Sequence, residues 1–184
     1  MEQTDTTLPE PKRKLPAGLL ATGVIALIVV VLLVVALAGE PAMPPQVGEL
    51  VPEFQLTAFD GSPMVLSSQR GKVVVVNFFA SWCGPCRQEA ADLEQSWQDH
   101  QARGVQFFGI GYKDAAQNVK RFLAEFEVTY PATTEGNNST ARAYGVTGAP
   151  ETFIIDSSGR LVRHILGPVG QAELAHELDR LLNP

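Results

Sequence analysis

The chain has 184 residues, of which 45% are hydrophobic, 18% are charged and 8% are aromatic, and its formal net charge is -6. Residues 40–184 carry 17 acidic and 11 basic side chains, so the net charge lies on that part. An acidic domain lacks the counterion release that drives most nucleic-acid binding, so nucleic acid is not an expected partner. Two cysteines three positions apart exclude a scaffold of several disulfides and an all-cysteine zinc site.

An apolar segment of 23 residues without a charged side chain runs from Ala17 to Gly39. Its length meets the roughly 20-residue requirement for a helix that crosses a bilayer core. The basic run Lys12-Arg13-Lys14 precedes it, and positive charge marks the cytoplasmic side. We therefore expect residues 17–39 to be a single-pass signal anchor in the cytoplasmic membrane, with the following domain on the extracytoplasmic side. A signal peptide cleaved after Ala38 is the alternative.

The pattern on either side of this segment predicts a simple domain organisation. Residues 1–16 are polar and contain Pro, which is typical of a short cytoplasmic tail. Residues 40–49 are rich in Pro and Gly and predict an extended linker. Residues 50–184 are enough for one hydrophobic core and too few for two ordinary domains.

The hydrophobic periodicity of the domain predicts alternating strands and helices. Residues 73–80 form a continuous apolar, β-branched run, which is typical of a strand buried on both faces. The other expected elements are a β-hairpin of strands 54–59 and 63–66, strands 105–111, 152–155 and 161–166, and helices 86–101, 114–126, 139–144 and 171–182. This order predicts an α/β fold with a central mixed sheet, covered by helices on both faces, and an added N-terminal β-hairpin.

The two cysteines lie in the run Trp82-Cys83-Gly84-Pro85-Cys86, where the buried strand gives way to a helix. The free amides and dipole of a helix N-terminus stabilise a thiolate and lower its pKa. Cys83 is therefore the candidate nucleophile, and Cys86, about one turn later, is the candidate resolving thiol. The alternatives are a structural short-loop disulfide or two unconnected thiols, and metal binding is less favoured still.

These residues resemble a known family. WCGPC after VVVVNFF resembles the thioredoxin superfamily, and GVTGAPETFIID, residues 145–156, is similar to the second signature of its membrane-tethered branch. Together with GIGYKD at residues 109–114, these runs are most similar to the cytochrome c biogenesis thiol:disulfide interchange proteins, the DsbE/CcmG group within the larger ResA/TlpA set. The resemblance spans about residues 47–182 and implies a thioredoxin-like fold. Gly84-Pro85 is a departure, because that group often has other residues between its cysteines.

The resemblance also implies how a substrate is bound. It implies a cis peptide bond between Ala149 and Pro150 that faces the redox-active Cys83–Cys86 disulfide, with the backbone of Ala149 free to pair with an extended substrate chain. We expect Trp82 to give an apolar contact surface beside the thiols. We expect Tyr112 to line the same mouth, because the carboxyl ends of the strands meet there.

A carboxylate near Cys86 would accept its proton before it attacks. Thioredoxins carry a buried Asp six residues before the first cysteine, where this chain has Asn77. Glu89 matches the acidic position of the DsbE/ResA type branch and is the candidate for tuning the thiols, and the alternative is a solvated Glu on the helix surface. Asp114 either lines the mouth or only caps a helix. His100, His164 and His176 have no metal-ligand spacing and are assigned no function.

The expected function is an extracytoplasmic thiol:disulfide oxidoreductase that reduces partner disulfides and needs no cofactor or metal. The resemblance implies apocytochrome c, with its CxxCH motif, or a haem-lyase component as substrate, and a DsbD/CcdA-like transmembrane thiol carrier as electron donor. We expect a monomer. The alternatives are a general extracytoplasmic thiol reductase or peroxide-linked redoxin, and a thioredoxin-like module that binds apocytochrome without redox turnover.

Overall fold

The computed structural model describes residues 25–33 and 43–183. Residues 25–33 are helical. Within these described ranges, no helix has the length and apolar character needed to cross a membrane. The predicted tail, most of the predicted anchor and residues 40–42 of the predicted linker lie outside the described residues.

The domain alternates strands and helices as expected. Its elements are β1 (Gln55–Thr57), β2 (Pro63–Val65), β3 (Val73–Phe79), α2 (Gly84–His100), β4 (Val105–Gly111), α3 (Ala116–Glu125), β5 (Ala132–Thr134), α4 (Ser139–Ala143), β6 (Glu151–Ile155), β7 (Leu161–Leu166) and α5 (Gln171–Leu182), with short 3-10 helices at Leu66–Gln69 and Gln101–Arg103. The predicted N-terminal hairpin is confirmed, because β1 and β2 pair antiparallel. Strand β5 was not expected.

The main sheet has the strand order β5-β4-β3-β6-β7. Strand β3 is parallel to β4 and antiparallel to β6, and β6 is antiparallel to β7. All seven residues of β3 are buried, as its continuous apolar run predicts for a strand with covered faces. The mixed sheet with a central parallel pair and an antiparallel edge is therefore confirmed.

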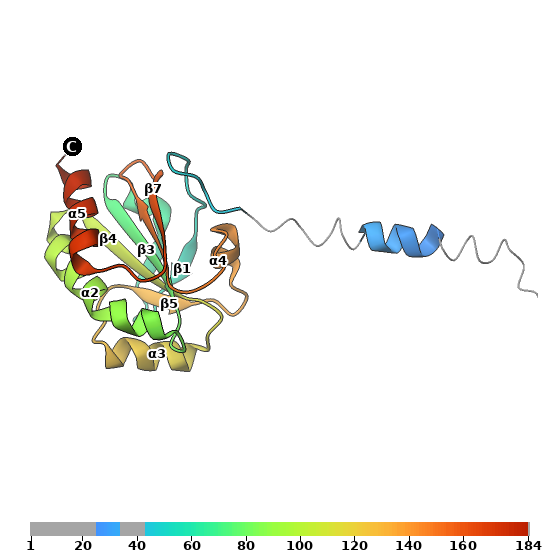
Figure 1. Cartoon of the computed structure of the whole chain (residues 1–184), viewed down its shortest axis with the longest axis horizontal. Helices are drawn as coiled ribbons and strands as arrows, with labels where there is room; N and C mark the ends of the chain where they lie inside the picture. Colours follow the sequence, from blue (N-terminus) through green and yellow to red (C-terminus); the bar gives the residue numbers. More distant parts are fainter. Residues whose placement is uncertain (1–24, 34–42, 184) are drawn as a thin grey trace, which may run out of the picture. The chain divides into compact units, whose positions relative to one another are not determined.

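Side chains of β3 alternate between two cores, one on each face of the sheet. Val74, Val76 and Phe78 pack with residues of the hairpin and of α4. Val73 and Val75 pack with residues of α2 and α5. Figure 1 shows α2 and α5 together on one side of the sheet and α4 on the other. This packing fixes the C-terminal end of β3, where the cysteines follow.

Strand β5 is three residues long, too short for a period-2 pattern to be recognised in the sequence. It pairs parallel with the end of β4. A Cβ atom on Gly111 would lie 2.8 Å from Cγ2 of Val119 and 2.9 Å from Cβ of Thr134. Gly111 therefore lets β5 and α3 approach the end of β4.

Candidate active site

The two cysteines lie at the start of helix α2, directly after the buried strand β3. Cys83 is the N-cap residue of the helix, and its Sγ accepts a hydrogen bond from the backbone N–H of Cys86 at 3.1 Å. The two sulfurs are 2.14 Å apart, so the structure holds the oxidised disulfide form. Both cysteines are nearly completely buried. A helix N-terminus that donates to the first sulfur is the arrangement that stabilises a thiolate on Cys83.

The loop between β3 and α2 is tied to the end of β4 by Asp114. Its carboxylate accepts the backbone N–H of Ser81 at 2.7 Å, the backbone N–H of Ala115 at 2.8 Å and the side-chain amide of Asn118 at 3.2 Å. Burial raises the pKa of Asp114, but these hydrogen bonds outweigh it and leave the pKa below its ordinary value. The N-cap residue of α3 is Ala115. Asp114 thus supports the start of α3 and also holds the cysteine loop.

The second loop of the site carries the cis peptide bond between Ala149 and Pro150. The carbonyl oxygen of Ala149 lies 3.3 Å from Sγ of Cys83. The isomer and the position that the family resemblance implied are therefore both present. A shallow pocket beside this loop is lined by residues 147–151 together with Leu166 and Gly167. Leu166 is 70% exposed there, which gives an apolar surface next to the cis-proline loop.

Glu89 is buried inside the domain, with 2% of its surface exposed. Its Oε1 accepts the side-chain amide of Asn77 at 3.0 Å, and its Oε2 accepts the backbone N–H of Val169 at 2.9 Å. Burial raises the pKa of Glu89 to about 7, against the opposing effect of these two hydrogen bonds. The alternative of a solvated surface side chain is wrong. A buried carboxyl that titrates near neutral pH, three residues after Cys86 on one helix face, suits proton exchange with a thiol.

Glu151 is a buried acid with a structural role that no motif in the sequence predicts. Its Oε1 accepts hydrogen bonds from the backbone N–H groups of Thr147 at 2.8 Å and Gly148 at 2.9 Å, and from the Thr147 hydroxyl at 3.1 Å. Its Oε2 lies 2.8 Å from Nε2 of His164. Glu151 therefore holds the loop that leads to Ala149, and His164 holds Glu151. The only signal in the sequence was an acidic residue at the start of a strand that is otherwise apolar or uncharged.

The two aromatic residues expected at the mouth occupy different environments. Trp82 is 60% exposed, and its indole N–H donates to the carbonyl of Lys113 at 3.3 Å. Tyr112 is buried, and its hydroxyl donates to the carbonyl of Thr147 at 3.4 Å. Tyr112 therefore contacts the cis-proline loop from inside the domain, whereas Trp82 presents its ring to solvent beside Cys83.

Within residues 25–33 and 43–183, no group of three or more His, Cys, Asp or Glu side chains could hold a metal ion.

Residues 46–182 match the Redoxin family. The chain belongs to this family. It is 34% identical over 148 residues to the thiol:disulfide interchange protein HelX of Rhodobacter capsulatus, covering 80% of this chain and 78% of that protein. It is 30% identical over 135 residues to the thiol-disulfide oxidoreductase ResA of Geobacillus thermodenitrificans, covering 73% of this chain and 78% of that protein.

A solved structure agrees with these relatives. The thiol:disulfide interchange protein of the thioredoxin family from Chlorobium tepidum superposes with a TM-score of 0.67 at 32% identity, covering 79% of this chain and 99% of that one. The fold is therefore thioredoxin-like. With the disulfide between Cys83 and Cys86 at the start of α2, this Redoxin family member is a thiol:disulfide oxidoreductase.

Proposed function

We propose that the protein reduces disulfide bonds of partner proteins on the extracytoplasmic side of the cytoplasmic membrane, in the maturation of c-type cytochromes. The observation that carries the proposal is the combination of the Cys83–Cys86 pair with the buried Glu89, whose pKa is raised to about 7. The motif resemblance to the DsbE/CcmG group supports apocytochrome c, or a haem-lyase component, as the partner. Residues 17–39 serve as the membrane anchor in this proposal.

The reaction begins with the reduced dithiol. The Cys83 thiolate attacks one sulfur of the partner disulfide, which forms a mixed disulfide and releases the other partner sulfur as a thiolate that takes up a proton. Cys86 then loses its proton and attacks Sγ of Cys83. This step forms the Cys83–Cys86 disulfide and releases the second partner thiol. Two electrons and two protons pass to the partner, and the protein is left in the oxidised state that the structure describes.

Glu89 is suited to the second step. Cys86 must be deprotonated before it attacks, and Cys86 is 1% exposed, so bulk water has little access to it. A buried carboxylate with a pKa near 7 accepts a proton readily at neutral pH and also returns it readily. Asn77 and the Val169 amide hold both oxygens of Glu89 in place through this exchange.

Substrate binding uses the surface around Cys83. The exposed ring of Trp82 and the exposed side chain of Leu166 give apolar contacts, and the backbone of Ala149 is available to an extended chain. After each turnover the disulfide is reduced again by a transmembrane thiol carrier of the DsbD/CcdA type, because the oxidised protein cannot attack a further disulfide.

The experiment is a complementation assay in cells that lack the protein, scored by the amount of cytochrome c with covalently bound haem. The full chain is expected to restore maturation, and the double variant Cys83→Ser/Cys86→Ser is expected to abolish it. External dithiothreitol is expected to rescue the double variant, because it supplies the missing reduction. The control Lys72→Gln changes an exposed residue at the opposite end of β3 and is expected to restore maturation fully.

Two results would overturn the proposal. Full maturation with the double serine variant would show that the cysteines are not needed and would favour a binding role, in which the domain holds apocytochrome without reducing it. Loss of maturation that dithiothreitol does not rescue would show that the cysteines act in maturation other than by reducing a disulfide.

A further inference from the structure

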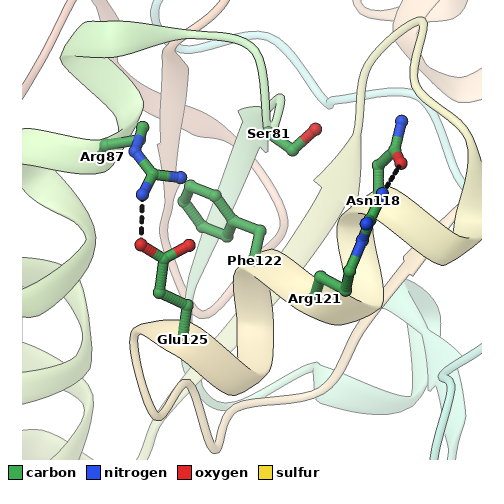
Figure 2. Close-up of a pocket in the computed structure, with 6 residues that line it drawn as sticks. All are labelled: Ser81, Arg87, Asn118, Arg121, Phe122 and Glu125. Carbon is green, nitrogen blue, oxygen red and sulfur yellow. Dashed lines mark hydrogen bonds and ion pairs between the residues drawn. The ribbon is translucent and has the colours of Figure 1, made fainter.

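A pocket of about 290 Å³ opens between helices α2 and α3, beside the cysteine loop. Figure 2 shows its lining: Ser81 lies above the ring of Phe122, with the Arg87–Glu125 pair on one side and the Asn118–Arg121 pair on the other. We call it the arginine pocket, and it is lined by Ser81, Arg87, Asn118, Arg121, Phe122 and Glu125. The mechanism above uses none of these side chains.

The pocket is lined by residues on both sides of the cysteine pair. Ser81 lies two residues before Cys83, and Arg87 directly follows Cys86. The floor of the pocket is Phe122, which is buried in the same side-chain cluster as both cysteines. A partner protein bound at Cys83 would therefore place the residues next to its own disulfide within reach of this pocket.

The six side chains that line the pocket carry one more positive charge than negative. Two guanidinium groups face one carboxylate, and that carboxylate, Glu125, is already paired with Arg87. Arg121 donates a hydrogen bond to the amide oxygen of Asn118 at 2.5 Å. Among the described residues, no ion pair involves Arg121. Asp114 is linked to two lining residues of the pocket, because its oxygens accept hydrogen bonds from Ser81 and Asn118 as well as from Ala115.

We propose that the arginine pocket binds an acidic side chain, Asp or Glu, of the protein whose disulfide is reduced. A guanidinium group presents a planar fork of donors that matches a carboxylate, and the Arg87–Glu125 pair already shows this match within the pocket. The hydroxyl of Ser81 offers a further donor. The volume lies at the lower end of the range for small-molecule sites, which suits one side chain better than a cofactor.

This inference rests on the proposed reductase function, because it assigns a specificity feature to that reaction. The rest of the domain is acidic and repels acidic partners in general. A local positive pocket beside Cys83 would therefore orient a partner so that its acidic residue and its disulfide meet the site together. The pocket would act on the capture of the partner, so its effect would appear in the second-order rate constant of disulfide reduction.

The test uses the full chain in its reduced form and a set of disulfide-bearing peptides that differ at one position. A single Glu is moved through three positions on each side of the disulfide, and each peptide is compared with its Gln counterpart. At least one Glu peptide is expected to react about five-fold faster than its Gln partner at low salt, the scale of one exposed ion pair. The advantage is expected to disappear near 1 M salt, where the screening length falls to about 3 Å.

Two variants move the Glu-to-Gln rate ratio in opposite directions. Arg121 is the arginine of the pocket that forms no ion pair with the described residues. Arg121→Gln removes its guanidinium and is expected to bring the Glu-to-Gln rate ratio down to about one. Glu125→Gln removes the carboxylate that competes for Arg87 and is expected to raise the ratio above that of the natural chain. The control Lys72→Gln makes the same charge change as Arg121→Gln at the far end of β3 and is expected to leave the ratio unchanged. A merely structural role of these helix residues would not give opposite shifts.

The outcomes separate this inference from the function on which it rests. Equal rates for every Glu and Gln pair, with all peptides reduced, would overturn the arginine pocket and leave the reductase intact. A ratio that falls equally in Arg121→Gln and Lys72→Gln would also overturn it, because the preference would then follow net charge. Failure of the reduced chain to reduce any peptide would overturn the proposed function itself.

Discussion

The side-chain amide of Asn77 in strand β3 donates a hydrogen bond to Oε1 of Glu89, a buried acid of helix α2, at 3.0 Å. The same amide donates to the hydroxyl of Thr152 at 2.9 Å. Thioredoxins, which this chain resembles, carry an Asp at the position of Asn77. Here the strand supplies an amide that orients the acid, and the acid itself stands three residues after Cys86. The proposed proton acceptor, Glu89, and the proposed resolving thiol, Cys86, therefore belong to the same helix.

The first prediction concerns the role of Glu89 in proton transfer. In Glu89→Gln, attack of Cys86 on a mixed disulfide at Cys83 is expected to slow by about 100-fold at pH 8, the lower range for loss of a general base. In the natural chain this rate should rise with pH through about 7, as Glu89 loses its proton. The measurement follows release of a coloured thiol from a preformed mixed disulfide across pH 5–9.

The matched control is Glu94→Gln, on the same helix, where Glu94 binds Thr129 at the surface. Its profile should follow that of the natural chain. A Glu89→Gln profile that keeps the rise near pH 7 would assign that rise to another group and remove Glu89 from the mechanism.

A second prediction follows from the raised pKa of Glu89 itself. The folded protein holds this proton up to about pH 7, whereas the unfolded chain releases it near 4.5. The stabilising effect of the protonated form is therefore complete below pH 4.5 and is lost as pH rises through 7. Relative to Glu89→Gln, the natural chain should lose up to about 3 kcal/mol of unfolding free energy between pH 4.5 and 8. Urea unfolding of both proteins at several pH values measures this difference, and parallel pH curves would contradict the raised pKa.

The third prediction concerns the anchoring of the cis-proline loop by Glu151. Glu151→Ala removes the acceptor for the amides of Thr147 and Gly148, so hydrogen exchange at these two amides should accelerate strongly. The loss of stability should be about 3 kcal/mol, because buried donors are left without a partner. Strand β3 provides the internal control. An equal acceleration at β3 amides would mean global destabilisation and would contradict a local role in the loop.

The fourth prediction separates the two effects of Asp114. Asp114→Ala should lower the free energy of unfolding by about 2 kcal/mol. It should also slow disulfide exchange, because Ser81 loses the acceptor that fixes the cysteine loop. Asp156→Ala is the matched control, since Asp156 holds Ser158 and Arg160 in the β6–β7 turn with comparable hydrogen bonds. It should cost similar stability and leave the exchange rate unchanged. Equal rates in the two variants would show that Asp114 acts on stability alone.

Much of the fold could be predicted because its central elements have strong local patterns. The continuous apolar run of β3 and the Gly-Pro pair at the start of α2 mark the strand-to-helix junction without knowledge of any contact. The positions of Cys83 and Cys86 follow from that junction. The cis-proline loop was placed opposite the sulfurs only through the family resemblance, because no local pattern reports which loops meet in space.

The features that were missed depend on distant pairing. His164 pairs with Phe153 across β6 and β7 and stacks on its ring at 4.1 Å, which brings it diagonally beside Glu151. The sequence does not give the strand register, and a bulge at Ile154 and Ile155 shifts it further. The contact of Glu89 with Val169 spans 80 positions and likewise requires the packed fold.

The most direct test of the proposed reductase role is the reduction potential of the Cys83–Cys86 disulfide. The full chain is equilibrated in dithiothreitol redox buffers, and the free thiols of Cys83 and Cys86 are quantified. A potential of about -200 mV or lower, towards the thioredoxin end of the range, is expected, because the protein must pass electrons to partner disulfides. A potential near about -120 mV, as in the oxidant DsbA, would contradict the reductase role and identify a protein that forms disulfides.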